Sequence, residues 1–298
     1  MFCDEINGRI ATFLKEKGFG FEQNTVVRYS ENDSSVVVRL FAEESNFYVK
    51  AFWGRSKETV LQEIRFINKI SECGISVPKI IHIDGECVFA CEWKSCCIIF
   101  YIMSELIGDT IVVKETYFDI ASKIADIHNM KEKFQCFEQG ERKSDHYRLE
   151  EFLTENRKFV SEFLNVEQVK HMLSNHIPPN DFRLIHSDLY MGNIVTVNGH
   201  FGGLIDFSDV RNGLPEDDFA KFLQNLLTSH VDFCLAKEIV EIYAKKRNYQ
   251  IDFKEIYLSC IYRILFNYRS IDKQPDKEIS EKYKRATNFC ITEYEKYE

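Results

Sequence analysis

The sequence lacks the features that mark membrane-spanning and secreted proteins. Its longest apolar run, residues 96–103, is far too short to span a bilayer. The first five residues contain neither a basic region nor an apolar segment, so we expect no export signal. The ten cysteines show no paired C-x-x-C spacing. We therefore expect reduced core cysteines in a cytoplasmic protein, not a disulfide framework.

Phosphate-binding glycine motifs are also missing. No G-x-x-x-x-G-K-[ST] occurs in the 298 residues, which excludes the P-loop mode of nucleotide binding. There is no excess of positive charge either. The net charge of −9 argues against a nucleic-acid-binding surface and is compatible with a cationic small substrate. With 45% hydrophobic and 29% charged residues, the composition is that of a globular protein long enough for one large domain or two lobes.

What the sequence does contain is a stretch, residues 184–207, whose polar residues suit phosphoryl transfer. His186, Asp188 and Asn193 have the spacing H-x-D-x-x-x-x-N, and Asp206 follows eighteen residues after Asp188. An aspartate can accept a hydroxyl proton, while an amide oxygen and a second carboxylate can hold Mg²⁺ against the phosphates of a nucleotide. The motif alone is a weak signal, and the second carboxylate strengthens it.

A hairpin is predicted within the same stretch. The sequence V-N-G-H at residues 197–200 supplies a turn between the apolar runs 193–197 and 201–207. Pairing of these runs would bring Asn193 and Asp206 close together, as a shared metal ion requires.

The stretch resembles the catalytic and metal-binding segments of the aminoglycoside phosphotransferase family, small-molecule relatives of the protein kinases. Protein kinases place an arginine inside the first motif and a glycine after the second, where this chain has Ser187 and Ser208. The resemblance implies an α+β, two-lobed protein-kinase-like fold. A small β-rich, nucleotide-binding N-lobe would span residues 1–105. A larger helical C-lobe with the catalytic loop, metal loop and substrate site would span residues 106–298.

In the N-lobe, residues 25–29, 36–41 and 46–53 are predicted strands, rich in Val, Tyr and Phe. The polar turn 30–35 between the first two strands has no G-x-G-x-x-G loop. The family uses a serine-containing loop here, so Ser34 is a candidate phosphate contact. An ordinary turn is the alternative.

Lys50 lies on the third predicted strand, where a kinase-like lobe carries the lysine that binds the α- and β-phosphates. The alternative is an edge-strand lysine in contact with solvent. In the predicted helix 57–72, Glu63 shares the apolar face of Val60 and Ile67. An inward carboxylate needs a partner, because burying it unpaired is costly. We therefore predict that Glu63, and not Glu58, pairs with Lys50.

Strand-like runs at residues 77–82, 87–93 and 96–103 would complete the sheet. The following segment resembles the family's linker between lobes, whose backbone groups bind the purine edge. On that resemblance the carbonyl of Ser104 and the amide of Leu106 would face the base, with adenine and guanine both open.

In the C-lobe, residues 115–130 are predicted to form an amphipathic helix in which His128 is a packed structural residue. Residues 131–145 are the best candidate for a mobile loop, and residues 147–176 again show a helical pattern that ends before two prolines. Three further helices are expected near residues 232–246, 252–270 and 279–297.

The segment after the metal loop resembles the family's G-D-P-x-x-D-L-A sequence, with Asp218 at the final aspartate. Near a helix start, its carboxylate favours free amides and the helix dipole, and we predict that it supports the catalytic loop. His186 is expected to support the geometry of that loop. Asp209 either borders the substrate site or hydrogen-bonds the turn.

Taken with the resemblance, these residues predict a cytoplasmic, Mg²⁺-dependent enzyme that transfers the γ-phosphoryl group of ATP or GTP to a hydroxyl of a small molecule. Asp188 would be the catalytic base, Asn193 and Asp206 the Mg²⁺ ligands, and Lys50, fixed by Glu63, the phosphate contact. An aminoglycoside-like cationic acceptor is expected, which would permit a role in antibiotic resistance. No nucleic acid or membrane is expected as a partner, and the oligomeric state is open.

Two alternatives remain. Choline, ethanolamine, homoserine and sugar-type kinases share these elements, so the acceptor is not fixed. A kinase fold without activity could act as a binding protein, which the complete set of site residues disfavours.

Overall fold

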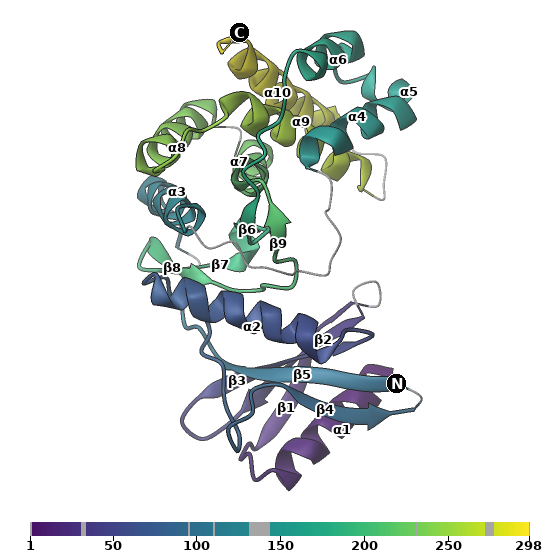
Figure 1. The fold of residues 1–298 in the computed structure, drawn as a ribbon, viewed down its shortest axis with the longest axis vertical. Coiled ribbons are helices and arrows are strands. Elements are labelled where there is room, and N and C mark those ends of the chain that lie inside the picture. Colours follow the sequence, from purple (N-terminus) through teal and green to yellow (C-terminus); the bar gives the residue numbers. More distant parts are fainter. Residues whose placement is uncertain are drawn as a thin grey trace. The chain divides into compact units, whose positions relative to one another are not determined.

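The computed structural model describes residues 2–30, 34–94, 96–109, 111–130, 144–230, 232–271 and 277–297. They form a mixed α and β structure, as predicted (Figure 1). The chain divides into two compact units. The first comprises residues 1–108 with 203–205, and the second comprises residues 109–202 with 206–298. Each unit is described by itself.

The first unit is built on an antiparallel sheet with the strand order β1-β2-β3-β5-β4. Two helices accompany the sheet, and the bounds of helix α2 are those that the apolar spacing predicts. The elements are α1 (Phe2–Glu16), β1 (Gln23–Ser30), β2 (Ser35–Phe41), β3 (Asn46–Trp53), α2 (Lys57–Glu72), β4 (Phe89–Trp93) and β5 (Cys96–Ser104).

Alternation along β3 divides its side chains between two apolar cores. Val49 and Ala51 share a buried cluster with Ile6 and Ile10 of α1. Phe52, on the other face, belongs to a cluster with residues of α2. Because successive side chains of a strand point to opposite faces, Lys50 lies on the α2 face with Phe52. The β3 lysine is thus directed toward the helix that carries the predicted glutamate.

One predicted strand is wrong. Residues 77–82 form only an isolated bridge, between Ile80 and Met103. Backbone hydrogen bonds from Ile81 N to Ile102 O and from Ser104 N to Lys79 O hold the segment beside β5. Pro78 has no N–H to donate, and this prevents the ladder from extending toward the N-terminal side of the segment.

The second unit is mainly helical, and helix α7 lies among its other helices (Figure 1). Nearly every side chain of α7 is buried, including three acidic residues at its start. The helices are α3 (Lys114–His128), α4 (Asp145–Glu155), α5 (Arg157–Val160), α6 (Val166–Ser174), α7 (Pro215–Ser229), α8 (Phe233–Lys246), α9 (Phe253–Arg269) and α10 (Lys277–Glu295). The short elements are β6 (Arg183–Ile185), η1 (Met191–Asn193), β7 (Ile194–Val197), β8 (His200–Leu204) and β9 (Arg211–Gly213). The last two residues of β8 belong to the first unit.

The helical pattern predicted over residues 147–176 is divided into three helices, α4, α5 and α6. Asn156 ends α4, and Asn165 begins α6 by accepting hydrogen bonds from the amides of Glu167 and Gln168. Asparagine side chains compete for backbone groups and so favour helix ends over helix interiors. Of the loop predicted at residues 131–145, residues 131–143 lie outside the described part, and Asp145 already belongs to α4.

The predicted hairpin is present as β7 and β8. Its two turn residues, Asn198 (φ 52°) and Gly199 (φ 77°), both have left-handed backbones, as the tight hairpin turn requires. Gly203 has a different constraint: a Cβ there would lie 2.4 Å from the carbonyl oxygen of Ser76. Only glycine allows this close backbone approach.

Among the described helices, none has both the length and the apolar character of a membrane span. The eight cysteines whose side chains the structure describes are free thiols. Of the described cysteines, Cys260 and Cys290 are buried, and Cys87, Cys91 and Cys96 are partly buried against the core of the first unit. The expectation of core cysteines is wrong for the exposed ones, which are Cys73, Cys97 and Cys234.

Candidate active site

In the first unit, Lys50 and Glu63 form the predicted ion pair. Nζ of Lys50 lies 3.0 Å from Oε1 of Glu63, and each residue is only 3% exposed. Tyr101 donates its hydroxyl to the same carboxylate oxygen at 2.8 Å, and Arg55 lies 3.6 Å from Oε2. Breaking a buried pair by removing one partner typically costs about 3–5 kcal/mol, so these contacts hold the lysine firmly.

Sequence reasoning missed the two additional contacts of Glu63. Tyr101 pairs with Lys50 across β3 and β5, which places both side chains on one face of the sheet. Strand alternation would have predicted the contact of Tyr101 if the register between β3 and β5 had been known. Arg55 precedes α2 in an irregular segment, where no periodicity applies.

At the predicted linker, Ser104 and Glu105 anchor the chain to the first unit. The Ser104 amide donates to the carbonyl of Lys79, and its hydroxyl accepts from the Lys79 amide at 2.9 Å. Glu105 accepts hydrogen bonds from Arg39 at 2.7 Å and from Asn46 at 2.7 Å. The linker is therefore held by side chains that the sequence did not single out. The base contacts expected of Ser104 and Leu106 stay predictions.

Ser34 begins the described part of the chain after the β1–β2 turn and has a left-handed backbone, with φ 48°. Its carbonyl accepts a hydrogen bond from the amide of Trp53 at 3.0 Å. The preceding loop residues 31–33 lie outside the described residues. The phosphate contact assigned to Ser34 stays a prediction.

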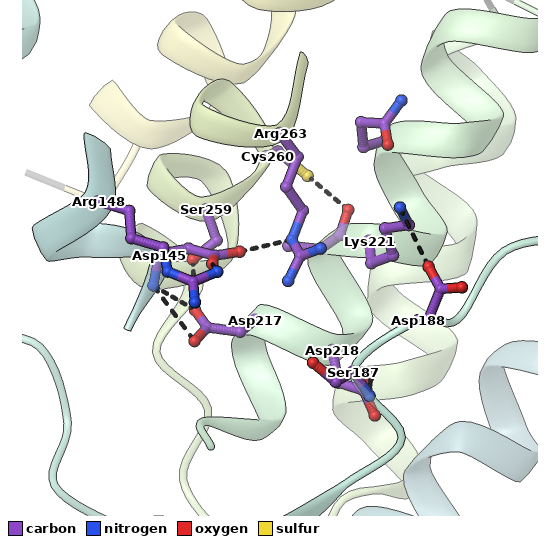
Figure 2. Close-up of polar contacts among 12 residues, drawn as sticks. Asp145, Arg148, Ser187, Asp188, Asp217, Asp218, Lys221, Ser259, Cys260 and Arg263 are labelled. Atoms are coloured by element: carbon purple, nitrogen blue, oxygen red, sulfur yellow. Dashed lines mark hydrogen bonds and ion pairs between the residues drawn. The ribbon is translucent and has the colours of Figure 1, made fainter. Parts of the chain in front are cut away.

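In the second unit, Asp188 is held through both of its carboxylate oxygens. The side-chain amide of Asn193 donates to Oδ2 and to the backbone carbonyl of Asp188, each at 3.0 Å. Lys221, from α7, lies 3.2 Å from Oδ1 (Figure 2). Because Asn193 uses its nitrogen toward Asp188, the planar amide directs its carbonyl oxygen away from that carboxylate.

Asp218 fastens the backbone of the catalytic loop. Its carboxylate accepts hydrogen bonds from the amides of His186 at 2.9 Å and Ser187 at 2.7 Å. These amides belong to the loop that Asp218 was predicted to support, and not to its own helix. Ser187 has φ 71°, a strained backbone for a non-glycine residue, and the two hydrogen bonds compensate for that strain. Figure 2 shows the contact between Ser187 and Asp218 beside Asp188.

His128 contacts Asp218 from α3. Its Nε2 lies 3.1 Å from Oδ2 of Asp218, and its Nδ1 lies 2.8 Å from the hydroxyl of Tyr243. Burial alone would raise the pKa of Asp218, yet the contact with His128 and the loop amides keep that pKa below its ordinary value. Burial lowers the pKa of His128. A neutral imidazole that donates to Asp218 and accepts from Tyr243 satisfies all three groups.

His186 is fully buried inside the loop that it was expected to support. Its Nδ1 lies 3.4 Å from the amide of Asp188, and its ring lies 4.9 Å from the ring of Phe207. Arg211, which follows the metal loop, donates from Nε to the hydroxyl of Ser187 at 2.7 Å. The antiparallel pairing of β6 with β9 brings this arginine to the loop.

The metal loop places Asp206 in a left-handed backbone with φ 60°. The hydroxyl of Ser208 donates to Oδ1 of Asp206 at 2.5 Å. A carboxylate and an amide oxygen, from Asp206 and Asn193, are the hard oxygen donors that Mg²⁺ prefers. Both residues belong to the second unit, and the hairpin joins them. Their approach to one metal ion stays a prediction. Asp209 is exposed on the turn after this loop.

The acidic residues at the start of α7 are buried. Glu216 is 4% exposed and Asp217 is fully buried. Figure 2 shows Asp217 in a network with Asp145, Ser259 and Arg263. Its carboxylate accepts from the hydroxyl of Ser259 at 2.8 Å, and Arg263 lies 2.5 Å from Asp145. Burial, then the nearby Asp145 and Glu255, raise the pKa of Asp217 well above its ordinary value.

Comparisons with known proteins identify the family. The model of the phosphotransferase enzyme family (APH) matches residues 18–251. The chain therefore belongs to this family of phosphotransferases, the one its catalytic stretch resembles. No curated protein matches the sequence.

Solved structures cover nearly the whole chain at low sequence identity, and they confirm the protein-kinase-like fold class. One is an amicoumacin kinase in complex with AMP-PNP, Ca²⁺ and Ami, with 17% identity, a TM-score of 0.65, and coverage of 97% of this chain and 96% of that chain. A microcompartment-associated aminopropanol kinase has 13% identity, a TM-score of 0.64, and coverage of 96% and 97%. A spectinomycin phosphotransferase in complex with ADP and spectinomycin has 12% identity, a TM-score of 0.58, and coverage of 96% and 98%.

Proposed function

We propose that the protein transfers the γ-phosphoryl group of a nucleotide to a hydroxyl of a small, amine-bearing molecule. The observation that carries this proposal is the arrangement around Asp188. Its carboxylate is oriented by Asn193, and its loop is fastened to α7 by Asp218. A side chain held in this way is suited to orient an acceptor hydroxyl and to take its proton.

The phosphates and the base of the nucleotide would be held by residues of the first unit. Lys50, fixed by Glu63, would contact the α- and β-phosphates, and Ser34 would add a phosphate contact from the β1–β2 turn. The carbonyl of Ser104 and the amide of Leu106 would bind the purine edge. The donor would be ATP or GTP, and the AMP-PNP and ADP bound to two of the similar structures support a nucleotide donor.

Asn193 and Asp206 would hold Mg²⁺. Their donor atoms fit a hard cation that takes oxygen ligands. The bound ion would neutralise charge that develops on the transferring phosphoryl group. The side-chain amide of Asn193 would then have two roles. Its nitrogen orients the carboxylate of Asp188, and its oxygen would face the ion. This dual use explains why an amide, and not a second carboxylate, occupies the position.

An amine-bearing acceptor is supported by charge and by relatives. The net charge is −9, and Asp209 is exposed beside the metal loop. One similar structure is named an aminopropanol kinase. A positively charged amine would be attracted by the negative net charge and by the carboxylate of Asp209. We further propose that the first unit is the nucleotide-binding lobe, that the second carries the acceptor site, and that the enzyme acts in the cytoplasm.

The deciding experiment is a turnover screen with purified protein against a panel of small hydroxyl compounds, with ATP and with GTP. The panel pairs each amine with a neutral analogue: aminoglycosides with neutral sugars, and aminopropanol with propanediol. Formation of a phosphorylated product by the native enzyme, and its loss in Asp188→Asn, would support the proposal. Nucleotide binding without turnover of any compound would instead favour a binding protein with a kinase fold.

A further inference from the structure

A second cluster of chemically reactive side chains lies in the second unit, apart from the catalytic loop. It consists of His146 on α4, His176 after the end of α6, and Glu255 in the first turn of α9. These residues are 5%, 9% and 0% exposed. One ligand atom from each lies within 4.8 Å of the other two. Three segments that are distant in sequence thus direct two imidazoles and one carboxylate to a common point.

The distances match the edges of a metal coordination sphere. Nδ1 of His146 lies 3.4 Å from Oε2 of Glu255, and Nε2 of His176 lies 3.2 Å from the same oxygen. In a tetrahedral zinc site with bonds of about 2.0–2.1 Å, neighbouring ligand atoms are separated by roughly 3.3 Å. Both measured separations are close to that value. The third edge, between the two imidazole nitrogens, is no longer than 4.8 Å.

Hydrogen bonding within the described residues leaves this cluster incomplete. Nδ1 of His146 and Oε1 of Glu255 are buried, and neither has a hydrogen-bond partner there. His176 alone of the two imidazoles makes a hydrogen bond with the carboxylate. Buried polar atoms are nearly always satisfied, so an unpaired ring nitrogen facing a carboxylate calls for a further partner. A cation between the three residues would coordinate the nitrogen of each imidazole and the carboxylate.

The surroundings supply an entry path and a further donor. A cavity of about 230 Å³ adjoins the cluster, and His146 forms part of its wall together with Glu150, Lys170 and Ser174. Asp252 caps α9 by accepting from the Glu255 amide through Oδ1 at 3.0 Å. Its other oxygen, Oδ2, lies 3.6 Å from Nε2 of His176 and can complete the coordination sphere.

We propose that His146, His176 and Glu255 bind a divalent first-row transition metal ion, with zinc as the test ion. Two imidazoles and a carboxylate suit Zn²⁺, whereas Mg²⁺ takes oxygen ligands and keeps several waters. This site is therefore chemically distinct from the Mg²⁺ site proposed for phosphoryl transfer. The ion would join α4, the end of the α6 segment and the start of α9. It would stabilise the second unit and take no part in the reaction.

The test uses the full chain, stripped of metal with a chelator and refilled with Zn²⁺ or Co²⁺. We expect one zinc ion per chain, a rise in Tm of about 3 °C or more at saturating zinc, and the visible absorption of a tetrahedrally coordinated Co²⁺ ion. His146→Gln and His176→Gln should each weaken zinc binding by at least about 100-fold, since loss of even an outer partner costs 10–100-fold.

The matched control is His171→Gln, which removes an exposed histidine of α6 whose ring contacts Asn175. It should bind zinc like the native protein. Circular dichroism checks that each variant is folded, and two histidine variants are made so that a misfolded one does not end the test. Binding of less than one zinc per folded chain, or an unchanged zinc-dependent rise in Tm in both His146→Gln and His176→Gln, would overturn the proposal.

Discussion

The ammonium group of Lys221 lies 3.2 Å from one carboxylate oxygen of Asp188, and the amide of Asn193 lies 3.0 Å from the other. Both oxygens of the proposed base are therefore engaged before an acceptor arrives. The two contacting side chains differ in exposure: Asn193 is buried, whereas the side chain of Lys221 is 22% exposed. We infer that the flexible lysine, and not the amide, yields its place to the acceptor hydroxyl.

Lys221→Met should lower kcat/KM for the acceptor by about 10-fold, equivalent to roughly 1.4 kcal/mol of transition-state stabilisation. After the lysine has yielded its place on Asp188, it still keeps a positive charge beside the reacting groups. Lys221→Arg should retain most of the activity. The control Lys114→Met removes a surface lysine that pairs with Glu238. Steady-state kinetics that show equal losses for Lys221→Met and Lys114→Met would contradict this role.

Asp188→Asn should leave nucleotide affinity intact while kcat falls by about 100-fold or more, because a positioned general base typically contributes that much. The variant keeps the size of the side chain but cannot accept the proton. Isothermal titration with nucleotide and single-turnover kinetics measure the two effects separately. A variant that retains most of its kcat would remove Asp188 from the role of base.

Asp206→Ala should abolish the metal-dependent part of nucleotide binding, because this carboxylate is proposed to link Mg²⁺ to the phosphates. Calorimetric titration of nucleotide, with and without Mg²⁺, measures that part directly. Asp209→Ala is the neighbouring control, since Asp209 is exposed and lies outside the proposed metal site. If Mg²⁺ strengthened nucleotide binding equally in both variants, Asp206 would not be a metal ligand.

Glu216→Gln should stabilise the protein at pH 8 more than at pH 5. Burial raises the pKa of Glu216 from 4.5 to about 7 in the folded protein. Between the unfolded-state pKa of 4.5 and the folded-state pKa of about 7, the carboxyl group of Glu216 binds more protons in the folded state than in the unfolded state. The contribution of Glu216 to stability therefore falls as the pH rises through this range. The loss reaches roughly 3 kcal/mol at pH 7 and levels off at about pH 8.

Glutamine does not titrate, so the difference in Tm between Glu216→Gln and the native protein should grow from pH 5 to pH 8. Thermal unfolding followed by circular dichroism at both pH values gives that difference. Glu238→Gln, a half-exposed glutamate of α8, is the matched control. A pH-independent difference for Glu216→Gln would show that its carboxyl group titrates alike in the folded and unfolded states.

For the acceptor, kcat/KM should fall as ionic strength rises if the substrate is cationic, since salt screens its attraction to an acidic surface. Burial decides which acidic residues between the metal loop and α7 can attract a cationic substrate. Glu216 and Asp217 are buried, so Asp209 is the exposed acidic residue of this segment. Asp209→Asn should flatten the salt dependence, and a neutral acceptor should show none. A preference for neutral over amine-bearing acceptors would contradict the proposed substrate class.

Local spacing was enough to predict the elements and residues that interact with near neighbours in sequence. Helix α2 has its predicted bounds, and Glu63 shares the inward face with Val60 and Ile67, as helical periodicity requires. The pairing of Lys50 with Glu63 then follows from strand alternation, because β3 directs the Lys50 side chain toward α2. These inferences need only the regular geometry of a helix and of a strand.

Contacts between distant segments could not be predicted in the same way. Lys221 meets Asp188 because α7 packs beside the catalytic loop, and no periodicity in the sequence encodes that packing. The burial of Glu216 and Asp217 follows from the helices around α7, and the net charge of the sequence does not reveal it. The one predicted strand that is absent, at residues 77–82, had the right composition but contained Pro78.

The hydrogen bonds from the catalytic loop to Asp218 have a consequence for the order of events during synthesis. A ribosome that has just added Asn193 has made the whole catalytic motif, but not the carboxylate that shapes it. Asp218 follows twenty-five residues later, and Tyr243, which holds His128 against Asp218, later still. Closing contacts over such separations is slow compared with forming a single helix. In a nascent chain, the loop therefore acquires its final shape only after α3, α7 and α8 have assembled around it.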